Sequence, residues 1–180
     1  MKQKIPLQQA RRLASAIEQD LAPYCDFTQV VGSIRREELL VGDIDIMVIP
    51  NMLRSSDLFG AVLDASALEA AMPTLVEKWH AHKIAAGLKK KTYLLPSGVK
   101  LEIYVSDPDA WGVEVAIRTG PERFSRNCVT TVLYNGYLPK DCKIKDGWKV
   151  FRGETRVLIR TEKEFLDFLG LGWVEPEDRM

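Results

Sequence analysis

The fold of this chain is decided by the stretch VGSIRREELLVGDIDIMV, residues 31–48. Here a glycine, a serine and two arginines come shortly before an apolar run that carries Asp43 and Asp45. A buried strand avoids carboxylates, because an ionised group without a partner is costly to place in an apolar interior. We therefore expect a strand whose two aspartates face something that compensates their charge.

The spacing of the two aspartates puts both on one face of that strand. Side chains alternate between the faces of a strand, so Ile44 and Ile46 pack on one face while Asp43 and Asp45 project from the other, about 7 Å apart at the backbone. Like charges at that distance repel and raise one pKa. A divalent cation would compensate them, and ligation by oxygen alone suits magnesium or manganese.

Glu102, in the run KLEIY (100–104), is a candidate for a third ligand. It alternates with Leu101 and Ile103, as expected for a residue that projects from a strand face. If this strand lies beside the first, Asp43, Asp45 and Glu102 form one acidic cluster. The other interpretation of an isolated D-x-D pair, an exposed acidic patch without a cation, stays open.

The residues before the aspartates suit a phosphate group. Gly32 and Ser33 end a strand and open a short helix, where a glycine allows close approach and free N–H groups favour an anion. Arg36 can add a charge-assisted hydrogen bond. We expect Arg35 to lie in a solvated, salt-bridged turn. A phosphate cradle next to a metal cluster favours a nucleoside triphosphate with bound metal.

The composition is that of an ordinary globular protein, with 180 residues, 46% hydrophobic and 28% charged. The net charge is zero, which counts mildly against strong non-specific binding of nucleic acid but leaves room for a local basic groove. Three scattered cysteines predict reduced thiols. No apolar run is long enough to cross a membrane and no signal peptide is evident, so we expect a cytoplasmic protein.

Hydrophobic periodicity and turn residues predict both helices and strands, and the character of the sequence changes around 106–109, which we take as a lobe boundary. Thr161 and Glu164 form a capping box that opens the last helix. The predicted helices are 6–21, 66–82, 124–135 and 162–169. The predicted strands are 27–31, 41–49, 91–95 and 99–105.

At this point a family resemblance is plain. The pattern GSIRR…GDIDIMV resembles the nucleotidyltransferase signature of the DNA polymerase beta family, family X. RTGPERF (118–124) is similar to that family's T-G turn and following helix, and WVEPEDR (173–179) to its tail. The resemblance implies an α+β fold, with a palm at 1–105 whose central mixed sheet has flanking helices, and a lobe at 106–180 that binds the nascent base pair. It implies the minimal form known among viral members, without the lyase and helix-hairpin-helix domains.

The resemblance also assigns roles to individual residues. Asp43 and Asp45 match the pair that bridges two metal ions, and Glu102 matches the third catalytic acid, which is normally an aspartate. Lys91 and Arg126 would contact DNA. The nucleotide-binding set would be Gly32, Ser33, Arg36, Gly42, Thr119, Gly120, Glu122 and Ser125.

The function implied is a DNA-directed DNA polymerase of the gap-filling repair type. It would use two Mg²⁺ ions, or Mn²⁺, to join a dNTP to a primer 3′-hydroxyl with release of pyrophosphate. We expect a monomer whose partners are DNA and dNTP, and the origin could be viral or phage. One alternative is a template-independent enzyme or one that modifies a small molecule or a protein. A second alternative is a catalytically degenerate DNA-binding module.

Overall fold

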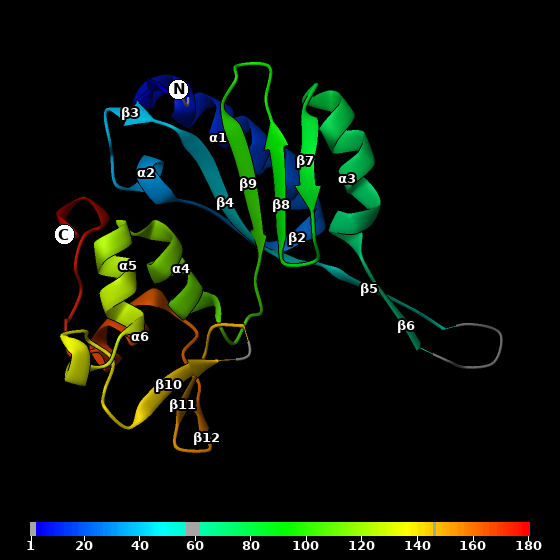
Figure 1. Ribbon diagram of the computed structural model, residues 1–180. Helices are drawn as coiled ribbons and strands as arrows, with labels where there is room; N and C mark the ends of the chain where they lie inside the picture. The colour runs from blue at the N-terminus through cyan, green and yellow to red at the C-terminus, as the bar shows by residue number, and fades with distance from the viewer. Residues whose placement is uncertain (1–2, 57–61, 146) are drawn as a thin grey trace. The chain divides into compact units, whose positions relative to one another are not determined.

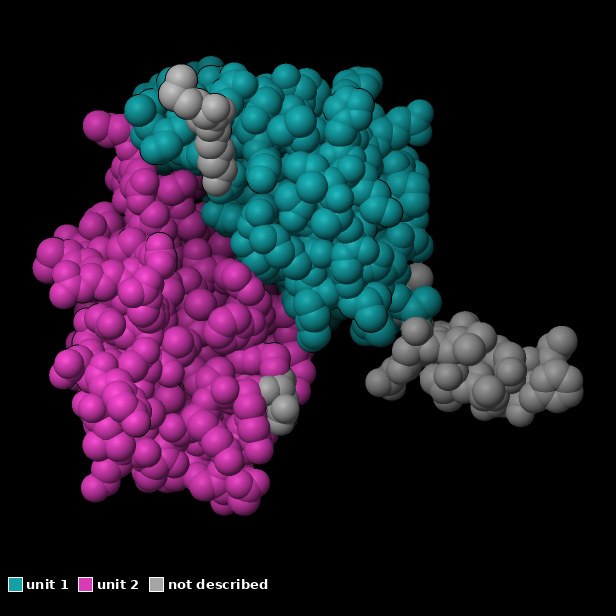
Figure 2. All heavy atoms as spheres, viewed as in Figure 1, with its two compact units in different colours: residues 1–30, 40–105 teal, residues 31–39, 106–180 magenta. Residues whose placement is uncertain are grey.

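The computed structural model describes residues 3–56, 62–145 and 147–180 and divides into two compact units, coloured separately in Figure 2. Unit 1 contains residues 1–30 and 40–105, and unit 2 contains residues 31–39 and 106–180. The sequence predicted a division into 1–105 and 106–180. The structure differs at residues 31–39, whose contacts lie in unit 2.

Unit 1 is built on a five-stranded mixed sheet with the strand order β2-β4-β9-β8-β7 (Figure 1). Strand β4 runs parallel to β9, whereas β9 pairs antiparallel with β8 and β8 with β7. The predicted α+β class with a central mixed sheet is confirmed. The strands are β2 (Cys25–Val31), β4 (Asp43–Pro50), β7 (His82–Ala86), β8 (Lys90–Leu94) and β9 (Lys100–Val105).

Two helices accompany this sheet, and Figure 1 shows α1 (Leu7–Leu21) behind it. The face of α1 that is buried carries Ala10, Ala14, Ile17 and Leu21, which recur at the helical spacing predicted from the sequence. Helix α3 (Ala67–Lys78) contains Pro73 and is capped by the Ser66 hydroxyl, which accepts a hydrogen bond from the Glu69 N–H.

Short elements complete unit 1. Strand β1 (Ile5–Pro6) pairs with β3 (Leu40–Val41), and β5 (Met52–Ser56) pairs with β6 (Val62–Ser66) as a separate hairpin. A turn of 3₁₀ helix (η1, Ala22–Tyr24) follows α1. The strand predicted at 27–31 is part of β2, which lies at the edge of the sheet, and Phe27 on it is 62% exposed.

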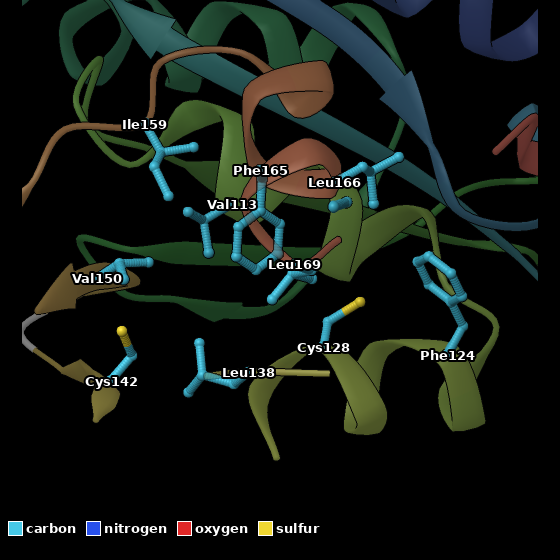
Figure 3. Packing of buried hydrophobic residues seen from close by; sticks show 11 residues of the cluster. Val113, Phe124, Cys128, Leu138, Cys142, Val150, Ile159, Phe165, Leu166 and Leu169 are labelled. Carbon is cyan, nitrogen blue, oxygen red and sulfur yellow. The ribbon is translucent and has the colours of Figure 1, made fainter. Parts of the chain in front are cut away.

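Unit 2 is a helical lobe with a small three-stranded antiparallel sheet. The sheet order is β10-β11-β12, and the connected buried core shown in Figure 3 includes Val113, Phe124, Phe165 and Leu166. Its helices are α2 (Gly32–Arg35), α4 (Trp111–Thr119), α5 (Glu122–Val129) and α6 (Glu162–Phe168). The other elements are β10 (Cys142–Lys145), β11 (Lys149–Arg152), β12 (Thr155–Val157), η2 (Val132–Tyr134) and η3 (Pro176–Asp178).

The helix predicted at 124–135 is wrong in length. Helix α5 ends at Val129, and the chain then forms the 3₁₀ turn η2. Backbone bonds fold the segment back on itself, with the Leu138 N–H donating to the Thr130 carbonyl and the Tyr137 N–H to the Asn127 carbonyl. These non-helical bonds satisfy the backbone polar groups that a continued helix would have paired.

The three cysteines, Cys25, Cys128 and Cys142, are free thiols and all are buried, as expected for reduced residues. Burial raises the pKa of Cys25 to about 11 and that of Cys128 to about 12. Among the residues that the structure describes, the helices are too short or too polar to span a bilayer.

Candidate functional site

The predicted acidic residues lie on two adjacent parallel strands of unit 1. Asp43 and Asp45 stand two residues apart on β4, and the Cα atom of Glu102 on β9 is the register partner of Asp45. Residues paired across a sheet project from the same face. The three carboxylates therefore share one face, as the alternation of the sequence predicted.

The Glu102 carboxylate is held by two donors on the same face. The Nζ atom of Lys90 on β8 lies 2.7 Å from Oε2 of Glu102, and the Tyr104 hydroxyl donates a hydrogen bond to the same oxygen. The Lys90 ammonium also lies 5.1 Å from the centre of the Tyr104 ring. Register explains the grouping, because Lys90 is the β8 partner of Tyr104 and Tyr104 is two residues from Glu102.

The fit of a divalent cation to this face depends on its donors. Three carboxylates supply the oxygen ligands that magnesium and manganese prefer, so the residue types fit. In the parts of the chain that the structure describes, however, no three His, Cys, Asp or Glu side chains are arranged together as metal ligands. The face thus brings the right groups onto neighbouring strands, but Glu102 is engaged with Lys90 instead.

Lys91 does not occupy the position expected of a DNA contact. It is the neighbour of Lys90 on β8, so its side chain projects from the opposite face of the sheet to Glu102. The side chain is only 3% exposed, and its Nζ atom pairs with the Glu69 carboxylate and donates to the Gly87 carbonyl at 3.1 Å. The prediction that Lys91 contacts DNA conflicts with this burial.

The predicted phosphate cradle lies in unit 2. Gly32 begins helix α2 with a φ of 66°, a conformation that a glycine adopts without strain. Ser33 follows it and is half-buried. Arg36 ends the turn, where its guanidinium donates to the Thr119 carbonyl and to the Glu38 carboxylate. Gly42, by contrast, lies in unit 1 between β3 and β4.

Arg35 does not lie in a solvated turn, contrary to the sequence prediction. Its guanidinium binds the Glu162 carboxylate through two hydrogen bonds of 2.9 and 2.6 Å and donates to the Thr119 hydroxyl at 2.7 Å. Arg179 donates to the same carboxylate at 2.7 Å, and its side chain is fully buried. One buried carboxylate thus connects α2, the first turn of α6 and the C-terminal segment.

The other residues assigned to the nucleotide lie around the turn between α4 and α5. Thr119 is fully buried, Gly120 has a φ of 69°, and the Ser125 hydroxyl donates to the Ile117 carbonyl at 2.6 Å. The Thr119 and Ser125 side chains are therefore occupied in holding this turn. Glu122 and Arg126 are exposed and form an ion pair with each other on α5.

The sequence analysis missed Lys90 and Tyr104 as neighbours of Glu102. The signal was available in the alternation of the predicted hairpin, because once Thr92 is paired with Glu102, Lys90 must share the face of the acids. It also missed the Glu162 carboxylate, which the local sequence does not mark as the shared partner of Arg35 and Arg179.

Comparisons with known proteins support the fold. No protein-family model matches the chain, and no curated protein sequence matches it. The structure is similar to the crystal structure of Leishmania infantum polymerase beta in a ternary P/T complex, with a TM-score of 0.72 and 17% sequence identity over 99% of this chain and 77% of that one. The chain therefore has a fold like that of polymerase beta.

Proposed function

We propose that this protein is a nucleotidyltransferase of the DNA polymerase beta family, family X, and that it fills gaps in DNA. In this proposal it transfers a nucleotide from a dNTP to a primer 3′-hydroxyl and releases pyrophosphate. Unit 1 acts as the palm, and unit 2 acts as the lobe that binds the nascent base pair. DNA and dNTP are then its partners.

The observation that carries the proposal is the register between β4 and β9. It brings Asp43, Asp45 and Glu102 onto one face of the sheet at neighbouring positions. The similarity to a polymerase beta in a ternary complex supports the same interpretation of the fold. A sheet face that carries three carboxylates suits a reaction in which the substrates supply both reacting groups.

In this proposal Asp43, Asp45 and Glu102 are the residues that would hold two divalent cations. Such ions, when bound, lower the pKa of the attacking hydroxyl and stabilise the charge of the leaving pyrophosphate. In the proposal the carboxylates fix the position at which the primer hydroxyl binds, and this positioning favours its reaction with the dNTP. The buried strands beneath them, with Ile44 and Ile46 both fully buried, keep this constellation rigid.

The residues proposed for the nucleotide belong mainly to unit 2. Ser33 and Arg36 are proposed to bind the triphosphate, with Gly32 allowing close approach of the backbone. The burial of Thr119 and the internal bond of Ser125 favour a contribution from the backbone of the turn at Gly120 rather than from those side chains. Glu122 and Arg126 are proposed to face the sugar, the base and the DNA. Gly42, which the resemblance also assigned to the nucleotide, lies in unit 1.

The test is extension of a primer across a one-nucleotide gap, with each dNTP in turn and with Mg²⁺ and Mn²⁺ compared. We expect Asp45→Asn and Asp43→Asn to lower the rate of nucleotide addition by roughly 100-fold or more, because each removes a charged metal ligand. Thermal unfolding should stay close to that of the wild type.

Asp26→Asn is the matched control, since Asp26 is an exposed aspartate on β2 of the same sheet. It should leave the rate unchanged. Full activity in Asp43→Asn and Asp45→Asn would refute the assignment of the metal site. Incorporation that ignores the template base would favour a template-independent or small-molecule transferase. Binding of DNA without any transfer would favour the degenerate binding module.

A further inference from the structure

The Glu102 carboxylate, which the proposed function assigns to a metal ion, is paired with an ammonium group. The Lys90 Nζ atom lies 2.7 Å from Oε2 of Glu102, which also accepts the Tyr104 hydroxyl. The two donors come from different strands, β8 and β9. They differ in exposure, because the Lys90 side chain is 44% exposed whereas Tyr104 is 6% exposed.

The strand order shows on which side of Glu102 the Lys90 contact lies. Strand β9 lies between β4 and β8, so Lys90 stands on the side of Glu102 opposite to Asp45. The pairing of Glu102 with Lys90 therefore joins β9 to β8, on the side of β9 away from β4. This agrees with the finding that no three acidic side chains of the described residues are set together as metal ligands.

We propose that Lys90 is the internal counter-ion of Glu102 in the metal-free protein, and that a divalent cation must displace it. This inference rests on the proposed function, because it concerns the same metal site. Displacing Lys90 from Glu102 costs little free energy, because a half-exposed ammonium regains its hydration when it leaves and such ion pairs are weak. The longer side chain of glutamate, compared with aspartate, is what gives the carboxylate reach toward both partners.

The inference makes Lys90 a competitor of the metal and not a residue that prepares the site for it. A positioning lysine would increase metal affinity, whereas a competing lysine lowers it. Tyr104 plays a different part, because a neutral hydroxyl donor can stay bonded to Oε2 when the ammonium leaves. The sign of the change in metal affinity on removal of the lysine charge therefore decides the question.

The experiment measures the dissociation constant for Mn²⁺ from the decrease of its free-ion electron paramagnetic resonance signal, in the whole chain without nucleotide or DNA. We expect Lys90→Met, which keeps the length of the side chain and removes the charge, to tighten Mn²⁺ binding roughly threefold or more. In a Glu102→Gln background the same substitution should change nothing further, because the two effects share one contact.

Lys89→Met is the matched control, since it removes an exposed positive charge one residue away from Lys90. It should change the dissociation constant much less than Lys90→Met does. Unchanged or weaker Mn²⁺ binding in Lys90→Met overturns the inference. It is also overturned if Lys89→Met tightens Mn²⁺ binding as much as Lys90→Met does, or if Lys90→Met tightens it equally in the Glu102→Gln background. If the Asp45→Asn variant binds Mn²⁺ as tightly as the wild type does, the proposed metal site itself is wrong. If Asp45→Asn loses Mn²⁺ binding but Lys90→Met leaves it unchanged, only the role of Lys90 is refuted and the metal site stands.

Discussion

Asp20, at the end of α1, shows how a single carboxylate joins two helices of unit 1. Its Oδ1 atom lies 2.7 Å from the Lys78 Nζ, and its Oδ2 atom accepts a hydrogen bond of 2.9 Å from the Trp79 indole N–H. Both partners stand at the end of α3. Burial alone would raise the pKa of Asp20, but the hydrogen bonds from Lys78 and Trp79 outweigh it and lower the pKa below its usual 3.8.

Asp20→Asn should lower the free energy of unfolding at pH 7 by about 1 kcal/mol, because Lys78 is largely exposed and such pairs are weak. A lowered native pKa contributes stability that is present above the unfolded value near 3.8 and is lost as the pH falls through the native value. The difference between wild type and variant should therefore shrink below pH 4. Urea unfolding at pH 7 and pH 3 measures it, and an equal difference at both pH values would contradict the explanation.

At this scale the sequence predicts which residue types lie on a face better than it predicts their partners. Alternation correctly placed Asp43, Asp45 and Glu102 on one face, because the period of a strand is a local property. The same rule could have separated Lys90 from Lys91, but only once the hairpin register was known. The partner of Arg35 lies 127 residues away in the sequence, and local spacing holds no information on it.

Among the elements of unit 2, α4 and α6 approach closely at a glycine. Gly112 is the second residue of α4, and a Cβ atom built on it would lie 2.2 Å from the carbonyl oxygen of Thr161. Thr161 is the N-cap of α6, where its hydroxyl accepts from the Glu164 N–H in a capping box. The contact is between backbones, so no flexible side chain can move to make room.

Gly112→Ala should destabilise the protein by about 1–3 kcal/mol or more, because α4 must move away from the cap of α6 and from the core around Phe165. Chemical denaturation of the variant measures this change. Gly87→Ala is the matched control, since a Cβ atom there would lie 3.4 Å from the Lys90 carbonyl oxygen, an ordinary contact distance. Equal stability of the two variants would show that α4 can move away from α6 with little loss of free energy of unfolding.

Helix ends were predictable where a side chain sets them and not where the tertiary structure does. The capping box of Thr161 and Glu164 marks the start of α6 in the sequence, and the structure has both of its hydrogen bonds. Helix α5 stops at Val129 although the sequence pattern continues to Asn135. There the chain turns back because Gly136 packs against the Thr130 backbone, a close approach that the periodicity of one segment does not encode.

At the scale of the whole molecule, the division into units does not follow the chain. Residues 31–39 interrupt unit 1 in the sequence but make their contacts in unit 2, through Arg35 and the Glu162 carboxylate. The sequence predicts one boundary near residue 106, where the character of the chain changes. It could not reveal that an earlier segment belongs to the second unit, because that membership depends on ion pairs between distant residues.

Glu162→Gln tests this membership. The substitution leaves Arg35 and Arg179 without a carboxylate, and because Arg179 is fully buried and Arg35 only 18% exposed, we expect a loss of about 3–5 kcal/mol. Hydrogen exchange should locate the effect, with lower protection for the amides of α4 and α6 and little change for those of β4 and β9. Asp167→Asn, which breaks an exposed pair with Lys163 on the same helix, should cost less than about 1 kcal/mol. If Glu162→Gln instead lowers hydrogen-exchange protection mainly in β4 and β9, the stability of residues 31–39 is coupled to unit 1 and the explanation is wrong.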